Sequence, residues 1–222
     1  QPLLVDEHRS RRGGLLAAAH LQPGHPLPEF GDLVFRFHVL FLVPKPGGRW
    51  RPVINLSRLN KFLSPPAFTM ETTAKLWSSI NRLDWAVSVD LSDAYLHIPM
   101  HRSTRRYLRF AFEGVIYTFR AMPFGLNTAP WVFTRVMDAV MGACRKKMSS
   151  QVSNYLDDIL IKSADKLSLA HDLQLILQIL RKLGFLVNLK KSDLVLAQKF
   201  THLGLSFDTV ENVVRLPPER LK

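Results

Sequence analysis

The stretch Asn154-Tyr155-Leu156-Asp157-Asp158-Ile159-Leu160-Ile161 sets two adjacent carboxylates between apolar residues. A segment that runs into the acidic pair and out through apolar residues predicts a β-hairpin with the pair at its tip. Carboxylates this close repel each other unless a cation lies between them, and Mg²⁺ takes oxygen ligands of this kind. A solvated acidic turn is the alternative, and a motif this short, taken alone, favours it.

Length and composition indicate a globular chain that suits a polyanionic partner. The 222 residues are enough for one large domain or two lobes, and 47% hydrophobic with 22% charged residues excludes a disordered chain. Thirty Lys and Arg residues against eighteen Asp and Glu give a net charge of +12, which suits nucleic acid. The single cysteine, Cys144, excludes a disulfide framework and a cysteine-rich zinc site.

The ends of the chain predict a piece of a longer protein. The sequence starts without Met and without a signal peptide, and no apolar run reaches the length of a membrane span. We therefore expect no membrane partner. The expected location is intracellular, and the sequence does not decide between cytoplasm and nucleus.

The first part of the chain predicts an irregular arm and then a cationic hairpin. Residues 1–32 are rich in Arg, Gly and Pro, which is typical of a linker or a loosely docked arm. An apolar segment over 33–43, a turn over 44–48 and a strand over 49–56 predict a hairpin carrying Lys45, Arg49 and Arg51. These cations could hold a triphosphate; an exposed edge strand protected by Lys and Pro is the alternative.

The middle of the chain predicts a second acidic strand end. A short helix is expected over 70–80, entered through Thr69, and alternating apolar residues then predict a strand that ends near Asp90. The segment 101–109 is strongly basic, and 110–119 predicts another hairpin.

Two amphipathic helices and a last hairpin complete the expected elements. A helix from about Pro130 has two apolar rows, Val132, Val136, Val140 and Cys144 in one and Phe133, Met137 and Met141 in the other. A second helix over 166–183 is expected to bury Leu169, Leu173, Ile176, Leu180 and Leu183 and to stop at Gly184. A hairpin is expected over 200–207.

If the two acidic strands are neighbours in one sheet, Asp90, Asp157 and Asp158 converge. Such a cluster can hold two divalent ions, one at the attacking hydroxyl and one at the leaving phosphate. Phosphoryl transfer also needs cations opposite the metals, and Lys45, Arg51 and Lys191 are the candidates. No zinc-type His spacing and no phosphate-binding Gly-rich loop is present in the sequence.

In this order the segments resemble the fingers and palm of a retrotransposon reverse transcriptase, of the LTR or tyrosine-recombinase type. Phe124 stands where retroviral enzymes usually have a glutamine. The resemblance covers about residues 37–210, and the six segments that carry it are 41–61, 89–95, 122–130, 155–158, 184–192 and 202–205.

The resemblance implies an α/β (α+β) fold, a right-hand polymerase palm whose antiparallel sheet is backed by helices, with a fingers subdomain. The implied division is an arm over 1–32, fingers over 33–83, palm over 84–99 and 121–199, a fingers/palm connection over 100–120, a primer-grip hairpin over 200–215 and the start of a thumb over 216–222.

The resemblance also implies residue roles. Asp90, Asp157 and Asp158 would be the catalytic metal ligands, and Lys191 the general acid, with Lys190 as its rival and a solvated basic turn as the alternative for both. Tyr95 would be a steric gate against a 2′-hydroxyl; an ordinary aromatic residue is the alternative. The implied nucleotide-binding set is Lys45, Arg51, Asp93, Ala94, Tyr95, Phe124 and Gly125, and the implied primer grip is His202, Leu203 and Gly204.

The implied function is RNA-directed DNA polymerase. The implied cofactor is two Mg²⁺ ions, with Mn²⁺ as a substitute, and the implied partners are an RNA or DNA template with its primer, deoxynucleotides, and thumb and ribonuclease H domains of a longer parent. Two alternatives stay open: a parent whose activity is ribonuclease H, with this segment as its polymerase part, and a remnant that binds nucleic acid without catalysis.

Overall fold

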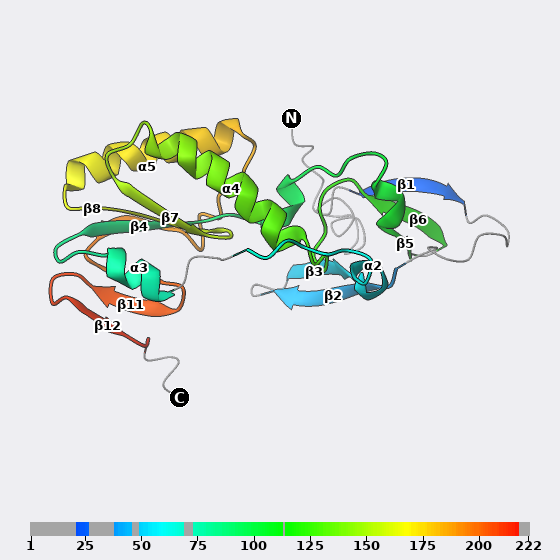
Figure 1. The fold of residues 1–222 in the computed structure, drawn as a ribbon, viewed down its shortest axis with the longest axis horizontal. Helices are drawn as coiled ribbons and strands as arrows, with labels where there is room; N and C mark the ends of the chain where they lie inside the picture. Colours follow the sequence, from blue (N-terminus) through cyan, green and yellow to red (C-terminus); the bar gives the residue numbers. More distant parts are fainter. Residues whose placement is uncertain (1–20, 27–37, 46–48, 69–72, 113, 218–222) are drawn as a thin grey trace. The chain divides into compact units, whose positions relative to one another are not determined.

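The computed structural model describes residues 21–26, 38–45, 49–68, 73–112 and 114–217, of which the side chains of 21–26, 45, 49, 73 and 74 are not described. The chain forms two compact units (Figure 1). The first contains residues 1–66 and 95–130, and the second contains 67–94 and 131–222. The boundaries differ from the expected ones, because 67–83 fall in the second unit and 121–130 in the first. The expected fingers and palm limits therefore stay predictions.

A four-stranded antiparallel sheet in the order β7-β8-β4-β9 forms the framework of the second unit. Its strands are β4 (Trp85–Asp90), β7 (Gln151–Tyr155), β8 (Asp158–Ser163) and β9 (Asp193–Ala197). Four consecutive residues of β8, Ile159 to Lys162, are buried because the strand has a neighbour on each side and cover on both faces. The predicted hairpin with the acidic pair at its tip is confirmed; β9 was not predicted.

The two faces of this sheet have different cover. Because side chains alternate along a strand, Val87 and Val89 share a face with Ile159 and Ile161, and α4 and α5 lie against that side (Figure 1). The opposite face packs on α3 (Thr73–Ser79) and on the sheet β10-β11-β12 through a core of Leu76, Ala86, Leu160, Phe200 and Phe207. The strands are β10 (Lys199–His202), β11 (Leu205–Asp208) and β12 (Val213–Arg215).

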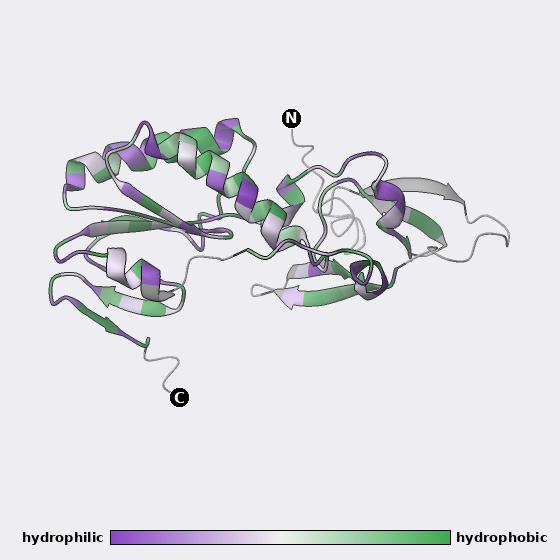
Figure 2. Cartoon of the chain, in the orientation of Figure 1, coloured by the Kyte–Doolittle hydropathy of each residue, from purple (hydrophilic) through white to green (hydrophobic). Residues whose placement is uncertain are grey.

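Helices α4 (Ala129–Arg145) and α5 (Lys166–Lys182) carry separate apolar and polar stripes (Figure 2). In α4 the row Phe133, Met137, Met141 is completely buried together with Cys144, whereas the valine row is half-buried. In α5 the predicted apolar face is confirmed except at Leu183, which is the C-cap and is 57% exposed. The helix begins at Asp165, whose carboxylate accepts hydrogen bonds from two first-turn amides.

One buried acid interrupts the apolar face of α5. Asp172 accepts hydrogen bonds from the backbone N–H groups of Ser149 and Ser150 at 3.0 and 2.8 Å. Burial raises the pKa of Asp172, but the hydrogen bonds from the Ser150 N–H and from the His171 and Ser149 side chains outweigh it and lower the pKa overall. The carboxylate thus fixes the chain that leads from α4 into β7.

The first unit contains two small sheets. A hairpin pairs β2 (Leu40–Lys45) with β3 (Arg49–Ile54), and a second sheet has the order β1-β6-β5, with β5 (Arg109–Phe112) and β6 (Val115–Phe119). Two expectations were wrong. Pro44 and Lys45 continue β2 rather than forming a turn, and the supposedly irregular segment contains β1 (Leu21–Pro26). Prolines are tolerated there because β1 is an edge strand and its register shifts between Pro23 and Pro26.

Short helical segments complete the described chain. They are α2 (Ser57–Asn60), the 3-10 turns η1 (Ala94–His97) and η2 (Arg105–Tyr107), and α3, which covers part of the helix expected over 70–80. Thr69, its expected cap, lies outside the described residues. Among the helices that are described, none is both long enough and apolar enough to span a membrane.

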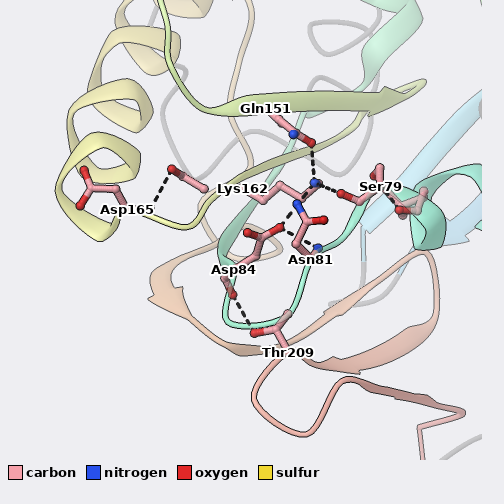
Figure 3. A network of polar contacts seen from close by, with 9 residues as sticks. Ser79, Asn81, Asp84, Gln151, Lys162, Asp165 and Thr209 are labelled. Atoms are coloured by element: carbon pink, nitrogen blue, oxygen red, sulfur yellow. Dashed lines mark hydrogen bonds and ion pairs between the residues drawn. The ribbon is translucent and has the colours of Figure 1, made fainter.

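A buried lysine joins several elements of the second unit (Figure 3). Lys162 of β8 is 2% exposed, and its ammonium donates to the carbonyl of Ser79 and to Gln151 Oε1, and lies 3.6 Å from Asp84 Oδ2. Burial lowers the pKa of Lys162, and the Asp84 carboxylate opposes this effect. The backbone carbonyl of Asp84 in turn accepts from the Thr209 hydroxyl at 2.7 Å. The network thus connects α3, β7, β8 and the segment that enters β4 with the turn after β11.

We predict that Lys162→Met lowers the free energy of unfolding by roughly 3–5 kcal/mol, because removing one partner of a buried ion pair leaves the other charge uncompensated. Urea denaturation measures this difference. Adding Asp84→Asn to the variant should recover part of the loss. Lys146→Met, at an exposed lysine, is the matched control and should stay within about 0.5 kcal/mol of the wild type. Equal stability of the Lys162 variant and the control would contradict the role of the network.

Candidate active site

Strand pairing brings the two predicted acidic positions together. In the antiparallel register of β4 with β8, Asp90 lies directly opposite Asp158. Because opposed residues point to the same face of a sheet, the two carboxylates project from one face. The backbone N–H of Leu91 donates to the carbonyl of Asp157 at 3.0 Å, so the third acid is held beside the end of β4.

Asp157 lies in a strained two-residue turn. Tyr155 pairs with Asp158, so only Leu156 and Asp157 connect β7 to β8. Leu156 has φ of 52°, and a positive φ at only the first turn residue is the pattern of a type II′ turn, where glycine is usual. A side chain in this conformation costs of order 1–3 kcal/mol and persists only when the flanking strands fix it. The pairing of β7 and β8 thus forces the acidic pair into a sharp, fixed tip.

The environment of Asp158 favours its neutral form. The pKa of Asp158 is raised to about 6 by burial first and then by the neighbouring carboxylates of Asp157 and Asp90, while Lys191 acts in the opposite direction. The carboxylates of Asp157 and Asp90 can raise this pKa only because the three acids lie close together. A carboxylate with this environment is stabilised by a bound cation.

The segment that follows α5 is attached to Asp90. The backbone N–H of Asp90 donates to the Ser192 hydroxyl at 3.0 Å, that hydroxyl donates to the carbonyl of Asn188, and Asn188 N–H donates to the carbonyl of Asp90. Lys191 Nζ lies 3.8 Å from Asp90 Oδ2. Of the two candidate lysines, the structure therefore brings Lys191 to the acids, whereas no contact of Lys190 with them is seen in the described residues.

The donor set fits a hard divalent ion in its chemistry. Three carboxylates gathered at the end of two strands are the ligand type that Mg²⁺ and Mn²⁺ prefer. Within the described ranges, however, no group of three or more His, Cys, Asp or Glu side chains has the arrangement needed to hold a metal ion. The described residues therefore show three neighbouring carboxylates but no formed metal site, and the ligand assignment stays a prediction.

The first unit brings together part of the predicted nucleotide-binding set. The Arg51 guanidinium lies over the Phe124 ring at 4.4 Å from its centroid, and the Tyr95 ring contacts the same ring at 5.1 Å. The buried Nε of Arg51 has no hydrogen-bond partner in the described structure. Lys45 pairs with Arg49 at the end of β2, but its side chain is outside the described part. Asp93 and Ala94 belong to the second unit, where Asp93 has a left-handed backbone with φ of 50°.

Gly125 is held by two asparagines that sequence reasoning missed. Asn60 Nδ2 donates to the Gly125 carbonyl at 2.8 Å, and Asn60 Oδ1 accepts from Asn127 N–H at 3.0 Å. Gly125 has φ of 99°, and a Cβ there would lie 2.6 Å from the carbonyl oxygen of Ile54. Asn60 and Asn127 are 67 residues apart, so only the folded chain shows that they act on one loop.

The predicted primer-grip residues form a second tight turn. His202 pairs with Leu205, and Leu203 and Gly204 both have positive φ, which is the pattern of a type I′ turn. His202 is 5% exposed, and burial lowers its pKa to about 4, so it is neutral at physiological pH. Leu203 packs against the core of the unit.

The family comparison agrees with this arrangement. Residues 43–207 match the family model described as "Reverse transcriptase (RNA-dependent DNA polymerase)". The chain belongs to the reverse transcriptase family. The match contains β4, the β7–β8 hairpin with its turn, the Phe124–Gly125 loop and the turn at Leu203.

The curated relatives of this reverse transcriptase chain are viral and transposon polyproteins. It is 30% identical over 167 residues to the Gag-Pol polyprotein of Walleye dermal sarcoma virus, covering 74% of this chain and 10% of the relative. It is also 30% identical to the Pro-Pol polyprotein of Simian foamy virus type 1 and to the Retrovirus-related Pol polyprotein from transposon opus of Drosophila melanogaster, covering 70% and 67% of this chain but 13% and 15% of those relatives. It thus spans a small part of their length.

Solved reverse transcriptase structures share the fold. The foamy viral protease-reverse transcriptase dRH in complex with double-stranded DNA has a TM-score of 0.76 at 24% identity, over 92% of this chain and 33% of that one. The foamy viral protease-reverse transcriptase in complex with an RNA/DNA hybrid has a TM-score of 0.75 at 22% identity, over 94% of this chain and 26% of that one. These likenesses confirm the predicted α/β fingers-and-palm fold.

We predict that Gly125→Ala destabilises the reverse transcriptase chain by at least about 1–3 kcal/mol, because a side chain at this φ is strained and its Cβ meets a backbone carbonyl. Gly142→Ala is the matched control: it lies in α4 with no atom within 4 Å of the new Cβ, and Ala is favoured over Gly in a helix. Urea denaturation should show opposite signs for the two variants. A shift in the same direction for both would contradict the close approach at Gly125.

We predict that Asp158→Asn raises the melting temperature of the metal-free protein at neutral pH. The folded pKa of Asp158, about 6, is above its ordinary value of 3.8. The folded state therefore binds this proton more tightly than the unfolded chain, so its stability falls as pH rises through that interval and stays lower above it. Asparagine does not ionise, so the Asp158→Asn variant does not lose this stability at neutral pH. Thermal melts in EDTA should show the gain at neutral pH and no gain at about pH 4.

Asp138→Asn, at an exposed acid of α4, serves as the control and should change the melting temperature equally little at both pH values. A lower melting temperature for Asp158→Asn at neutral pH would mean that the ionised Asp158 stabilises the fold. That result would remove the argument that this carboxylate is held in place for a cation.

Proposed function

We propose that this chain is the polymerase part of a reverse transcriptase and adds deoxynucleotides to a primer 3′-hydroxyl on an RNA or DNA template. The observation that carries the proposal is the register that sets Asp90 opposite Asp158, with Asp157 in the adjoining turn, in a chain of this family. In the reaction the primer oxygen bonds to the α-phosphorus of the nucleotide, and pyrophosphate leaves.

Asp90, Asp157 and Asp158 are proposed to hold two Mg²⁺ ions, with Mn²⁺ as a substitute. Bound there, the ions would favour the ionised primer hydroxyl and neutralise charge on the leaving pyrophosphate. The protein's own contribution is to keep three mutually repelling carboxylates at fixed backbone positions. The type II′ turn and the Asn188–Ser192 contacts to Asp90 support this role, because they leave the acidic backbone little freedom.

The residues of the first unit are proposed to bind the nucleotide. In the described structure, Arg51 forms no ion pair with a protein carboxylate, and its Nε has no hydrogen-bond partner. Its guanidinium group therefore suits a phosphate ligand. Lys45, Asp93, Ala94, Phe124 and Gly125 are assigned to the same function from the family motifs. Tyr95, whose ring is packed on Phe124, is proposed to be the gate against a ribose 2′-hydroxyl.

Lys191 is proposed to protonate the leaving pyrophosphate. Its Nζ is near the acids, at 3.8 Å from Asp90, while its side chain is 62% exposed and therefore able to reorient. The primer strand is assigned to the turn at His202, Leu203 and Gly204. Foamy viral relatives have been solved with double-stranded DNA and with an RNA/DNA hybrid, which supports a template-primer duplex as the partner. Thumb and ribonuclease H domains of a longer parent remain part of the proposal.

A non-catalytic nucleic-acid-binding remnant is the second candidate. The intact acids argue against it, because their close approach costs stability that binding alone does not require. A primer-extension assay distinguishes the two candidate functions, because only a polymerase gives metal-dependent incorporation of deoxynucleotides.

We predict that Asp157→Asn abolishes Mg²⁺-dependent extension of an oligo(dT) primer on poly(rA) by a protein in which the downstream thumb follows this chain. The loss should be at least about 10²-fold, because charge stabilisation at the reacting centre is removed. Duplex affinity in EDTA should change little. Asp138→Asn removes one carboxylate from the exposed side of α4 and should extend the primer like the wild type.

Extension by the Asp157 variant at the wild-type rate would refute the catalytic assignment. Failure of the wild type to extend with either Mg²⁺ or Mn²⁺, while it still binds the duplex, would instead favour the remnant.

A further inference from the structure

The end of β4 is paired with the segment that follows α5. Leu91 and Val187 form an antiparallel bridge, and this register places Asp90 opposite Asn188. Two opposed residues of an antiparallel ladder can exchange two backbone hydrogen bonds. One of these bonds is direct, because the Asn188 N–H donates to the Asp90 carbonyl at 2.8 Å.

The second bond of this pair passes through a side chain. The backbone N–H of Asp90 donates to the Ser192 hydroxyl at 3.0 Å, and that hydroxyl donates to the Asn188 carbonyl at 2.9 Å. The hydroxyl thus lies between the two backbone groups, as a bridging water does in other proteins. This position requires a group that accepts and donates at once, which a hydroxyl does and a methyl group does not.

A tight turn brings the Ser192 hydroxyl to this position. The Asn188 carbonyl also accepts from the backbone N–H groups of Lys191 and Ser192, at 3.0 and 2.9 Å. A serine that bonds back to the carbonyl four residues earlier fixes the local chain direction. Strand β9 begins at the next residue, Asp193, which pairs with Ser88 of β4. The turn is therefore attached to β4 at two places.

The Ser192 link lies where the pairing of β4 with β9 ends. On that side, β9 pairs with β4 only as far as Ser88. On the opposite side, the N–H of Leu91 donates to the Asp157 carbonyl at 3.0 Å. The end of β4 is thus held from one side by the Ser192 turn and from the other side by the acidic turn.

The position of Asp90 depends on these backbone contacts because its carboxylate is repelled by the other two acids. Without the Ser192 hydroxyl, the Asp90 N–H loses its acceptor and the end of β4 is held from one side less firmly. The same turn carries Lys191, whose Nζ lies 3.8 Å from Asp90 Oδ2. Ser192 therefore fixes both the acid and the cation next to it.

We propose that Ser192 is a positioning residue of the acidic site, whose hydroxyl bridges Asp90 and Asn188 and thereby holds Asp90 beside the turn that carries Asp157 and Asp158. Ser192 acts through the backbone of Asp90. The inference rests on the proposed function for its consequence, which is that a divalent cation meets carboxylates that are already gathered.

The test compares Ser192→Ala and Ser192→Thr with the wild-type chain. The matched control is Ser78→Ala: Ser78 is exposed on α3, and its hydroxyl donates to the Lys75 carbonyl at 2.9 Å, so the control also loses one hydroxyl hydrogen bond. Mn²⁺ affinity is measured by electron paramagnetic resonance of the unbound ion, and amide hydrogen exchange is measured by NMR in EDTA. Asp157→Asn, which lacks one proposed ligand, identifies the Mn²⁺ binding that belongs to the acids.

Ser192→Ala should bind Mn²⁺ at least about tenfold more weakly, which is the usual effect of removing a hydrogen-bond partner behind a metal ligand. In EDTA, exchange should be about five- to tenfold faster at the amides of both Asp90 and Leu91. The Leu91 amide bonds to Asp157 and not to Ser192, so its faster exchange reports movement of β4 against the acidic turn. Ser192→Thr keeps the hydroxyl and should restore both values, and the control should match the wild type.

Wild-type Mn²⁺ affinity and wild-type Leu91 exchange in Ser192→Ala would overturn the proposal. Faster exchange confined to the Asp90 amide would also overturn it, because Ser192 would then have only a local structural role. If Ser192→Ala does not fold, Ser192→Cys supplies a weaker donor and acceptor and should change both values in the same direction by less; no change in the cysteine variant would contradict the proposal. If the wild type binds Mn²⁺ no better than Asp157→Asn does, the metal assignment of the proposed function fails, while Leu91 exchange in EDTA still decides the role of Ser192.

Discussion

The antiparallel pairing of β4 with β8 is the constraint on which the rest of the site depends. It sets Asp90 opposite Asp158 although the two carboxylates repel each other. The apolar partners in the same ladder, Val87 and Val89 with Ile159 and Ile161, are all buried. Burying each such side chain contributes about 1.5–3 kcal/mol, which exceeds the repulsion between partly exposed acids. The core thus holds together charges that would separate on their own.

The same sheet face shows two different outcomes for a charged side chain. Lys162 and Asp158 lie on β8 four residues apart, so their side chains project from one face. The Lys162 ammonium has Asp84, Gln151 and the Ser79 carbonyl as partners, so the protein itself compensates this charge. For Asp158, burial and two acidic neighbours outweigh Lys191 and raise the pKa. A cluster of like charges that the protein's own groups do not neutralise indicates a ligand of opposite charge.

Sequence patterns predicted the elements that depend on neighbouring residues. Alternation of apolar and polar residues located β4, the acidic pair set between apolar residues located the β7–β8 hairpin, and spacing of three to four residues located α4 and α5. The same patterns could not show contacts between distant residues. Ser192, which accepts from the backbone of Asp90, is 102 residues away from it, and Asn60 and Asn127 meet only in the folded loop at Gly125.

Local composition also gave wrong predictions where strand pairing or the end of a helix decides the structure. The segment Leu21–Pro26 has the Pro and Gly content of a turn, yet it forms an edge strand because pairing with β6 needs few of its N–H groups. Leu183 fits the apolar period of α5 but is exposed, because the helix ends one residue before it. Lys162 is buried although lysine is usually exposed, and its partners Ser79, Gln151 and Asp84 come from separate segments that only the folded chain brings together.

The described acidic residues are unevenly distributed between the two units, although the first unit also contains Asp6, Glu7, Glu29, Asp32 and Glu113 outside the described ranges. Every Asp and Glu in the described part of the chain belongs to the second unit, whereas the described first unit has only Lys and Arg. Arginines that shared a surface with carboxylates would form ion pairs and lose their capacity for phosphate, and the carboxylates would lose theirs for cations. Within the second unit, ion pairs join Lys162 to Asp84, Lys199 to Asp208 and Arg215 to Glu211, and Lys191 Nζ lies 3.8 Å from Asp90. With its lysine side chain 62% exposed, such a pair contributes about 0–1 kcal/mol, so a divalent cation would displace it at little cost.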